Sequence, residues 1–168
     1  MRATLQLELR DRNGTVVARR RAHNAVMKTG ADLIARLFAG QGTPITHMAV
    51  GTSDTEPDAV TRTALRNEAV GGVPALGGDV DVAIPAAAFE GHIDDDATRR
   101  VVRIRFHATL PESAAVGTVR EAGLISRDAD GDVLYNRVIF APFQKGDDHE
   151  LTLFWEVSFP YGDLQWLQ

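Results

Sequence analysis

The chain has no cysteine among its 168 residues. Disulfide bonds, thiolate nucleophiles and cysteine-ligated zinc sites are therefore excluded. Long apolar runs are missing too, since no stretch approaches the roughly 20 residues of a membrane-spanning helix, and we expect no membrane insertion. A strong excess of basic charge is also absent, because the formal net charge is −5 and the sequence pI is about 5.5. Nucleic-acid-binding surfaces are basic, so we expect no nucleic-acid partner.

The composition is that of an ordinary folded chain, with 44% hydrophobic and 24% charged residues. A chain of this length buries roughly two-thirds of the surface that it exposes when unfolded, so it can fold without a metal or a disulfide. We therefore predict a single domain over residues 1–168, with an N-terminal hairpin at 1–21 and a C-terminal tail at 160–168.

The dominant hydrophobic period is two residues, which is typical of β-strands with one buried face. Leu5, Leu7 and Leu9 alternate with polar residues, and Asn13-Gly14 is a strong hairpin signal because both residues tolerate positive φ. Residues 15–18 then return as a second strand. The pattern predicts a β-hairpin at the start of the chain.

One segment has helical spacing instead. Its apolar residues recur three or four positions apart and include Met27, Ala31, Ile34, Ala35 and Phe38. Gly40, Gly42 and Pro44 follow, and such residues end helices. The spacing predicts one α-helix at about 28–39.

Most of the remaining chain alternates again. Strands are expected over 46–50, 79–84, 99–110, 118–126, 132–140 and 150–159, with polar or glycine-containing turns between them. Residues 63–70 are compatible with a short helix or a strand. The spacing predicts a mainly β fold, an antiparallel β-sandwich or a barrel-like sheet, with one helix packed on it.

Candidates for catalysis and metal binding are few. The histidines are His23, His47, His92, His107 and His149, and no two of them have ligand spacing within one element. Residues 128–132 resemble the start of a calcium loop, but a strand follows them, so a hairpin loop is favoured. Asp94-Asp95-Asp96 is expected to form a solvated turn. We therefore expect no catalytic residue, metal or cofactor; a small hydrolase built from distant carboxylates or histidines is the minor alternative.

The segment Glu121-Ala122-Gly123-Leu124 places a carboxylate and a glycine inside an apolar strand. Such a pattern predicts a bulge or a close backbone approach. Glu121 is expected to pair with Arg137 or Lys145 across neighbouring strands, the alternative being independent surface charges.

Two segments are candidates for partner binding. The basic run predicts an exposed strand edge or a protein interface, and the apolar residues beyond the last strand predict a partner-binding tail. These residues are Arg19, Arg20 and Arg21 in the first segment and Tyr161, Leu164, Trp166 and Leu167 in the second. Packing of the tail back onto its own sandwich is the alternative.

A series of short segments is spread in order over residues 22–159. They include His23-Asn24-Ala25-Val26, Gly30-Ala31-Asp32-Leu33-Ile34-Ala35, Met48-Ala49-Val50-Gly51-Thr52, Glu56-Pro57, Thr63-Ala64-Leu65, Glu121-Ala122-Gly123-Leu124, Leu134-Tyr135-Asn136-Arg137 and Trp155-Glu156. Their order and spacing resemble small β-rich structural proteins of tailed phages and of phage-tail-like contractile injection systems, the tail-fibre or baseplate-associated subunits. The chain lacks the repetitive or collagen-like stalk of complete fibres.

The resemblance implies a non-enzymatic structural subunit of a virion or phage-like particle that is assembled in the bacterial cytoplasm. Its partners would be further copies of itself and other structural proteins of the particle, contacted through strand edges and the tail. The alternative is a receptor- or carbohydrate-binding module of a tail fibre, with residues 52–62 and 93–98 as its binding loops and a cell-surface receptor or glycan as its partner.

Overall fold

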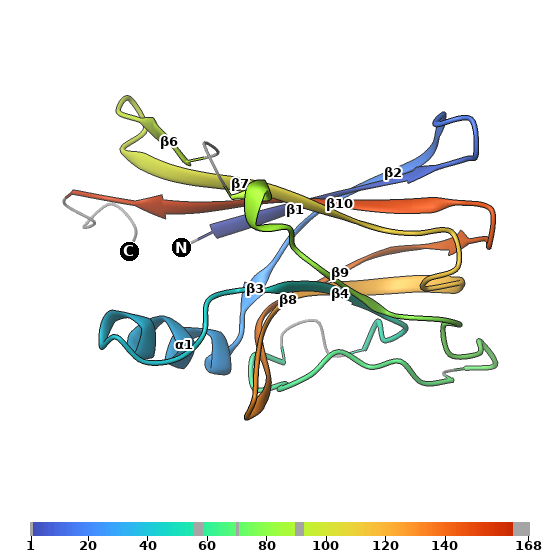
Figure 1. Cartoon of the computed structure of the whole chain (residues 1–168), viewed down its shortest axis with the longest axis horizontal. Coiled ribbons are helices and arrows are strands. Elements are labelled where there is room, and N and C mark those ends of the chain that lie inside the picture. The colour runs from blue at the N-terminus through green and yellow to red at the C-terminus, as the bar shows by residue number, and fades with distance from the viewer. Residues whose placement is uncertain (1, 56–58, 70, 90–92, 163–168) are drawn as a thin grey trace.

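The computed structural model describes residues 2–55, 59–69, 71–89 and 93–162. Two five-stranded antiparallel sheets lie one above the other (Figure 1). The first has the order β2-β1-β10-β7-β6 and contains β1 (Arg2–Arg10), β2 (Val16–His23), β6 (Ile93–Asp96), β7 (Val101–Leu110) and β10 (Glu150–Pro160). The second has the order β3-β9-β8-β4-β5 and contains β3 (Ala25–Val26), β4 (His47–Gly51), β5 (Asp81–Ala83), β8 (Gly117–Asp128) and β9 (Gly131–Lys145). The predicted mainly β, antiparallel sandwich is confirmed.

The core lies between the two sheets because alternate residues of each strand point inward. Leu5 and Leu7 of β1 face in, and their antiparallel partners in β10, Trp155 and Leu153, are also fully buried. The second sheet contributes Leu124, among others, to the same cluster. Most of the predicted alternation therefore becomes one continuous apolar interior.

The N-terminal hairpin is confirmed, but its turn is longer than a two-residue Asn-Gly connection. The Asp11 carboxylate accepts hydrogen bonds from the backbone N–H groups of Asn13 and Thr15, both at 2.9 Å. Gly14 has a φ of +77°, which a side chain would disfavour. The loop is thus organised by an aspartate side chain, a common turn device.

The hairpin of β8 and β9 is also where the sequence predicted it, although both strands are longer. Residues 128–131 close it tightly, since Asp128 pairs with Gly131. The hairpin interpretation of residues 128–132 is therefore confirmed. Two bulges interrupt the pairing, one between Val119 and Glu121 and one between Leu124 and Ile125, as the glycine-containing segment predicted.

The single α-helix, α1 (Lys28–Phe38), is close to its predicted bounds, and a short 3₁₀ turn, η1 (Ala86–Ala88), follows β5. Among the described residues, no helix has the length and apolarity needed to cross a membrane. Gly30 lets α1 approach β9, because a Cβ atom at this position would lie only 2.0 Å from the backbone oxygen of Tyr135. Helix and sheet are therefore in backbone contact here.

Two local expectations differ from the structure. Residues 63–69 form neither helix nor strand, because side-chain and carboxylate hydrogen bonds organise them as a loop. Asp94-Asp95-Asp96 does not form a solvated turn, and that expectation was wrong. These residues belong to the edge strand β6. Arg103, on the neighbouring strand β7, forms ion pairs with Asp94 and Asp96. Cross-strand ion pairing allows consecutive aspartates to occupy a strand.

The outer face of the first sheet is polar and carries further ion pairs. Glu8 of β1 is 5% exposed and contacts Arg10 at 2.5 Å and Arg19 at 2.8 Å. Burial acts to raise the pKa of Glu8, but the hydrogen bonds and charges of these two arginines outweigh it and hold the pKa below 4.5. The charged form of Glu8 is therefore favoured by folding.

Replacement of Gly30 by alanine tests the contact between α1 and β9. Helix propensity alone predicts a gain of about 1 kcal/mol for Gly30→Ala. The clash with the Tyr135 oxygen predicts the opposite, a loss of roughly 2 kcal/mol or more. Urea unfolding measures the difference, with Ala35→Gly as the control that changes propensity alone. A stabilised Gly30→Ala protein would contradict the close approach.

Acid should weaken the fold partly through Glu8. Since its pKa is lowered in the folded state, the stabilisation is complete above pH 4.5 and is lost as the pH falls through the folded value. We expect Glu8→Gln to cost at least about 1 kcal/mol at pH 7 and to flatten the decline in stability below pH 5. Denaturant midpoints from pH 7 to pH 3 test this, with Asp32→Asn as the exposed control; equal slopes for Glu8→Gln and wild type would oppose it.

Candidate functional site

An apolar groove opens at the end of the sandwich where α1 lies. Its volume is about 320 Å³, and its lining is aliphatic and aromatic. The lining residues are Leu33, Ile34, Leu37, Pro44, Ile45, Phe89, Ile104, Phe106, Leu124, Tyr135, Val157 and Phe159. Several of them also belong to the core, so the groove is part of the interior that remains open to solvent.

The groove follows from the arrangement of the layers. At this end, β10 extends over α1 (Figure 1), so a helix faces the first sheet. Ile104 of β7 and Val157 of β10 are direct partners and point to the inner face. Leu33 and Leu37 approach them from α1. Because a helix has a rounded surface, α1 leaves a channel between itself and the first sheet that a second flat sheet would fill.

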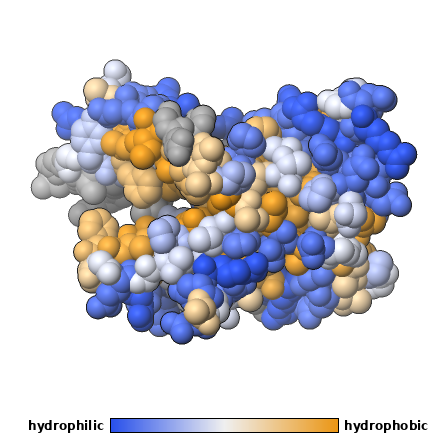
Figure 2. Space-filling view, in the orientation of Figure 1, coloured by the Kyte–Doolittle hydropathy of each residue, from blue (hydrophilic) through white to orange (hydrophobic). Residues whose placement is uncertain are grey.

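The rim of the groove is apolar as well, and apolar side chains reach the surface along the seam between the layers (Figure 2). Phe38 at the end of α1 is 89% exposed, and Ile93 of β6 is 65% exposed. Leu37, Phe159 and Tyr161 are each more than one-third exposed. Exposed apolar residues are usually scattered singly, and a cluster around an apolar groove is typical of an interaction surface.

The last described residues are tied to the rim of the groove. Tyr161 donates its backbone N–H to the Arg100 oxygen and its hydroxyl to Asp95, both at 3.0 Å. The hydrogen bond to Asp95, together with desolvation, raises the pKa of the Tyr161 hydroxyl. Burial raises the pKa of Tyr135 in the groove wall to about 12. Both phenols therefore stay neutral at physiological pH.

The position of α1, and so of one groove wall, is set by hydrogen bonds at its start. Met27 donates its backbone N–H to Tyr135, and the Thr29 hydroxyl donates to the Leu134 oxygen at 2.6 Å. The N–H of Lys28 donates to Val60, which belongs to the loop formed by residues 52–55 and 59–69. The helix is therefore held by β9 on one side and by this loop on the other.

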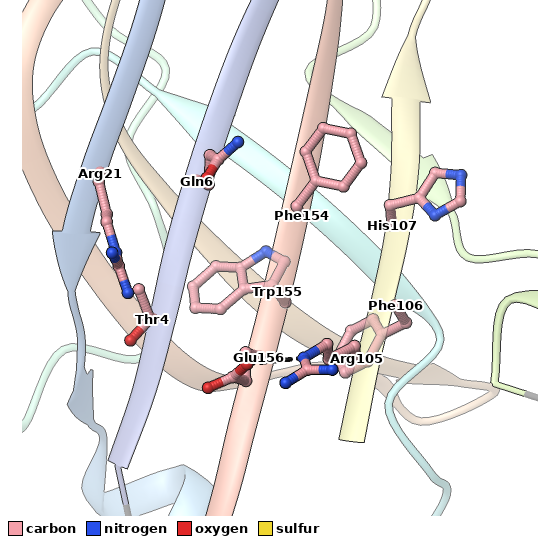
Figure 3. A pocket seen from close by; sticks show the side chains of 9 residues that line it. All are labelled: Thr4, Gln6, Arg21, Arg105, Phe106, His107, Phe154, Trp155 and Glu156. Atoms are coloured by element: carbon pink, nitrogen blue, oxygen red, sulfur yellow. Dashed lines mark hydrogen bonds and ion pairs between the residues drawn. The ribbon is translucent and has the colours of Figure 1, made fainter. Parts of the chain in front are cut away.

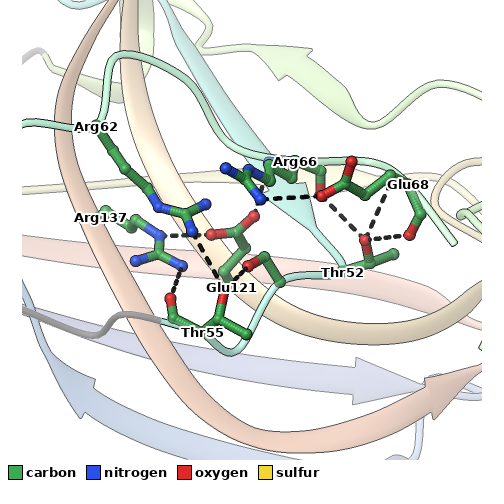
Figure 4. A network of polar contacts seen from close by, with 8 residues as sticks. Thr52, Thr55, Arg62, Arg66, Glu68, Glu121 and Arg137 are labelled. Atoms are coloured by element: carbon green, nitrogen blue, oxygen red, sulfur yellow. Dashed lines mark hydrogen bonds and ion pairs between the residues drawn. The ribbon is translucent and has the colours of Figure 1, made fainter. Parts of the chain in front are cut away.

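A buried ion pair holds the loop in turn (Figure 4). Glu121 of β8 and Arg137 of β9 lie on neighbouring strands, with the Glu121 Oε2 and Arg137 Nε atoms 2.5 Å apart and side chains 0% and 1% exposed. The other Glu121 oxygen accepts the backbone N–H of Arg66 at 2.7 Å, and Arg137 donates to the Thr55 oxygen at 3.0 Å. Each charge therefore binds both its partner and the loop backbone.

Gly51 makes room for the Glu121 carboxylate, and Gly123 makes room for the neighbouring strand and for Leu65 of the loop. A Cβ atom on Gly51 would lie 2.5 Å from both the Glu121 carboxylate and the Arg66 oxygen. A Cβ atom on Gly123 would lie 2.5 Å from the Asn136 oxygen. Gly123 is therefore the close backbone approach that the Glu121-Ala122-Gly123-Leu124 segment predicted. Nothing in the sequence indicated the same for Gly51.

Polar side chains in the loop complete its attachment. The Thr52 hydroxyl donates to the Glu68 oxygen at 2.7 Å, and Asn67 bonds both the N–H and the oxygen of Leu76. Local side-chain bonds of this kind replace secondary structure in the segment. Sequence analysis missed these residues, because threonine and asparagine are common in any loop.

Lys145, the other predicted partner of Glu121, lies elsewhere. Its side chain is buried, and Nζ donates to the oxygens of Pro111 and Glu112 at 3.0 and 2.9 Å. Burial lowers the pKa of Lys145, while nearby carboxylates oppose that effect. Of the two alternatives, the Arg137 pairing is the one observed.

The structure places the predicted partner-binding residues in different environments. Arg19 and Arg21 point to the outer face of the first sheet, whereas Arg20 donates to the Ala141 oxygen of the second. Tyr161 lies at the rim of the groove. Leu164, Trp166 and Leu167 lie outside the described residues. The basic run therefore forms an edge strand, and its three side chains do not act as one patch.

The four histidines that the structure describes are spread over the fold. His23, His47, His107 and His149 lie on four separate parts of the fold, and His92 is outside the described residues. Within the described ranges, no group of three or more histidine and acidic side chains is placed to hold a metal ion.

No protein-family model, curated protein or solved structure matches this chain.

The buried pair should dominate the stability of the loop and the helix. Glu121→Gln leaves the Arg137 charge buried without its counter-ion, and such losses cost about 3–5 kcal/mol. We expect a comparable cost for Arg137→Met, and a smaller cost for Glu121→Gln/Arg137→Met than the sum of the two single changes. Denaturant unfolding of the wild type, the two single variants and the double variant gives the coupling free energy between Glu121 and Arg137.

The exposed pair of Asp32 and Arg36 in α1 supplies the matched control. Its atoms are also close, at 2.6 Å, but the side chains are 61% and 60% exposed. Asp32→Asn should cost less than about 0.5 kcal/mol. Equal losses in the free energy of unfolding for Asp32→Asn and Glu121→Gln would show that the buried pair stabilises the protein no more than the exposed pair does.

Proposed function

We propose that this chain is a non-enzymatic structural subunit of a phage or phage-like particle, which associates with further copies of itself and with neighbouring structural proteins. The observation that carries the proposal is the apolar groove together with the exposed apolar residues of the elements that form it, of which Leu37 and Phe159 line the groove itself. Contact between such an apolar surface and water is unfavourable in free energy, and burial of the surface by a partner removes this contact.

The chemistry of the groove favours a protein occupant over a small molecule. Small-molecule sites place a few polar groups among apolar walls to orient the ligand. Among the described residues this lining is aliphatic and aromatic, and Tyr135 is the one side chain in it that carries a hydroxyl. A surface of that kind recognises side chains by shape and burial, as the cores of subunit interfaces do.

The chain itself contains a suitable occupant. Residues 163–168 include Leu164, Trp166 and Leu167, and they follow Gly162 directly. The preceding residue, Tyr161, is fixed at the rim of the groove. Six extended residues span at most about 20 Å, which is enough to reach an adjacent subunit. In the proposal, this segment of one copy fills the groove of a second copy.

The open edges of the first sheet are less suited to self-association. The edge strand β2 carries Arg19 and Arg21 on one face, and the opposite edge strand β6 carries Asp94 and Asp96. Charged side chains on edge strands oppose further strand pairing. The end of the sandwich is therefore the preferred contact, and the role in a particle rests on the segments that resemble phage structural proteins.

Assembly should depend on the groove and its rim. We expect the full chain to form oligomers in solution, and Phe38→Asp to weaken association about thirtyfold or more, because a charge would replace a large apolar contact. Removal of residues 163–168 should have a similar effect. Sedimentation velocity over a concentration series measures both.

Val17→Asp is the matched control, since Val17 is 50% exposed but lies on β2, away from the groove. It should leave the association unchanged. A monomeric full chain would contradict self-association. Loss of oligomers in Val17→Asp but not in Phe38→Asp would move the contact to the sheet edge, and a deletion that lowers stability without changing the oligomer would place the tail on its own subunit.

A further inference from the structure

A second pocket lies on the outer face of the first sheet (Figure 3), whereas the groove lies on the inner side of that sheet; Phe106 is part of both linings. Its volume is about 300 Å³, and four neighbouring strands line it. Strand register places the side chains in two rows. One row is Arg21, Gln6, Phe154 and His107, and the other contains Thr4, Glu156 and Arg105. Both rows stand on rigid, hydrogen-bonded strands, which suits a preformed site.

An aromatic pair provides the apolar part of this pocket. Phe154 and His107 are cross-strand partners, and their rings stack with centroids 5.4 Å apart and planes inclined by 30°. Both belong to the face that otherwise carries arginine, glutamate, glutamine and threonine. Stacked rings at a polar surface offer a flat apolar platform, on which the C–H face of a sugar ring can pack.

One cation of the pocket is uncommitted. Arg105 contacts Glu156 at 2.7 Å, Arg19 contacts Glu8 at 2.8 Å, and Arg103 is held by Asp96. The Arg21 side chain makes no hydrogen bond or ion pair within the part of the chain that the structure describes, although its backbone belongs to the β1–β2 ladder. Its guanidinium is therefore available for a carboxylate, which it matches in a two-bond geometry.

The surrounding charges limit the ligand to a small negative charge. Glu156 lines the pocket and Glu8 lies beside it, the Asp94 carboxylate is 3.8 Å from the Arg105 guanidinium, and the whole chain carries a net charge of −5. A polyphosphate or nucleic acid would meet these carboxylates, whereas a single carboxylate can be neutralised by Arg21 alone.

Uncommitted hydrogen-bonding atoms complete the site. Gln6 uses its amide N–H toward Glu8, which leaves the amide oxygen without a partner among the described residues. The hydrogen bond from Arg105 goes to Oε2 of Glu156, so that Oε1 remains available. These oxygens can accept hydroxyl protons, and a sugar ring supplies several of them.

We propose that this pocket binds a hexuronate, a sugar ring with one carboxylate, as a unit of an acidic glycan. The carboxylate binds Arg21, the ring lies on Phe154 and His107, and the hydroxyls bind Gln6 and Glu156. The site is independent of the groove, so the proposal stands whether or not the chain self-associates.

Titration with methyl glucuronide, followed by amide shifts in two-dimensional NMR, tests the site. We expect saturable shifts at the backbone amides of Gln6 and His107, and at least tenfold weaker binding of the neutral methyl glucoside. Arg21→Met and Phe154→Thr should each weaken binding at least tenfold. Acetate alone should not reproduce the shifts, since it lacks the ring.

Arg19→Met is the matched control, because it removes the same charge from the same strand and face while Arg10 still holds Glu8. It should change the affinity less than threefold. Unchanged binding by Arg21→Met, equal binding of the neutral sugar, or no saturable shift with methyl glucuronide would each overturn the proposal. Thermal unfolding of each variant separates a lost contact from a lost fold.

Discussion

The ion pair of Glu121 and Arg137 is the interaction on which the rest of this architecture depends. Burying two charges is expensive and is repaid only when every polar atom finds a partner. Here each charge also makes a hydrogen bond to the backbone of a loop that has no secondary structure. The loop in turn binds the first turn of α1 through Val60, and α1 forms one wall of the groove. A pair on one face of the second sheet thereby positions a surface at the end of the sandwich.

Sequence pattern predicted the elements of the fold because their periods are local. Alternation in β1 and β10 and helical spacing around Ile34 need no knowledge of distant residues. The pattern could not choose between Arg137 and Lys145 for Glu121, since bulges in β8 shift the register by amounts that only the folded hairpin fixes. The aspartates of β6 were misread as a turn because their counter-charges come from β7.

The candidate sites were less predictable than the fold for the same reason. The groove is lined from seven separate parts of the chain, and no lining residue is unusual in sequence. The outer pocket depends on the register of four strands, which aligns Arg21 with Phe154. The two surfaces differ in chemistry: one is lined by apolar groups, and the other combines an aromatic platform with Arg21, whose guanidinium has no partner among the described residues. Interactions at one surface therefore need not compete with those at the other.

The hydrogen bond from the Arg66 amide to Glu121 has a consequence for the motions of the protein. An amide in an irregular surface loop ordinarily exchanges its proton with water through small local openings. The Arg66 proton is instead bound by a fully buried carboxylate. Its release leaves the Oε1 atom of Glu121 buried without this donor, so deuterium should enter at this site more slowly than at loop amides that face water. Proteases that need an unfolded loop would meet the same cost.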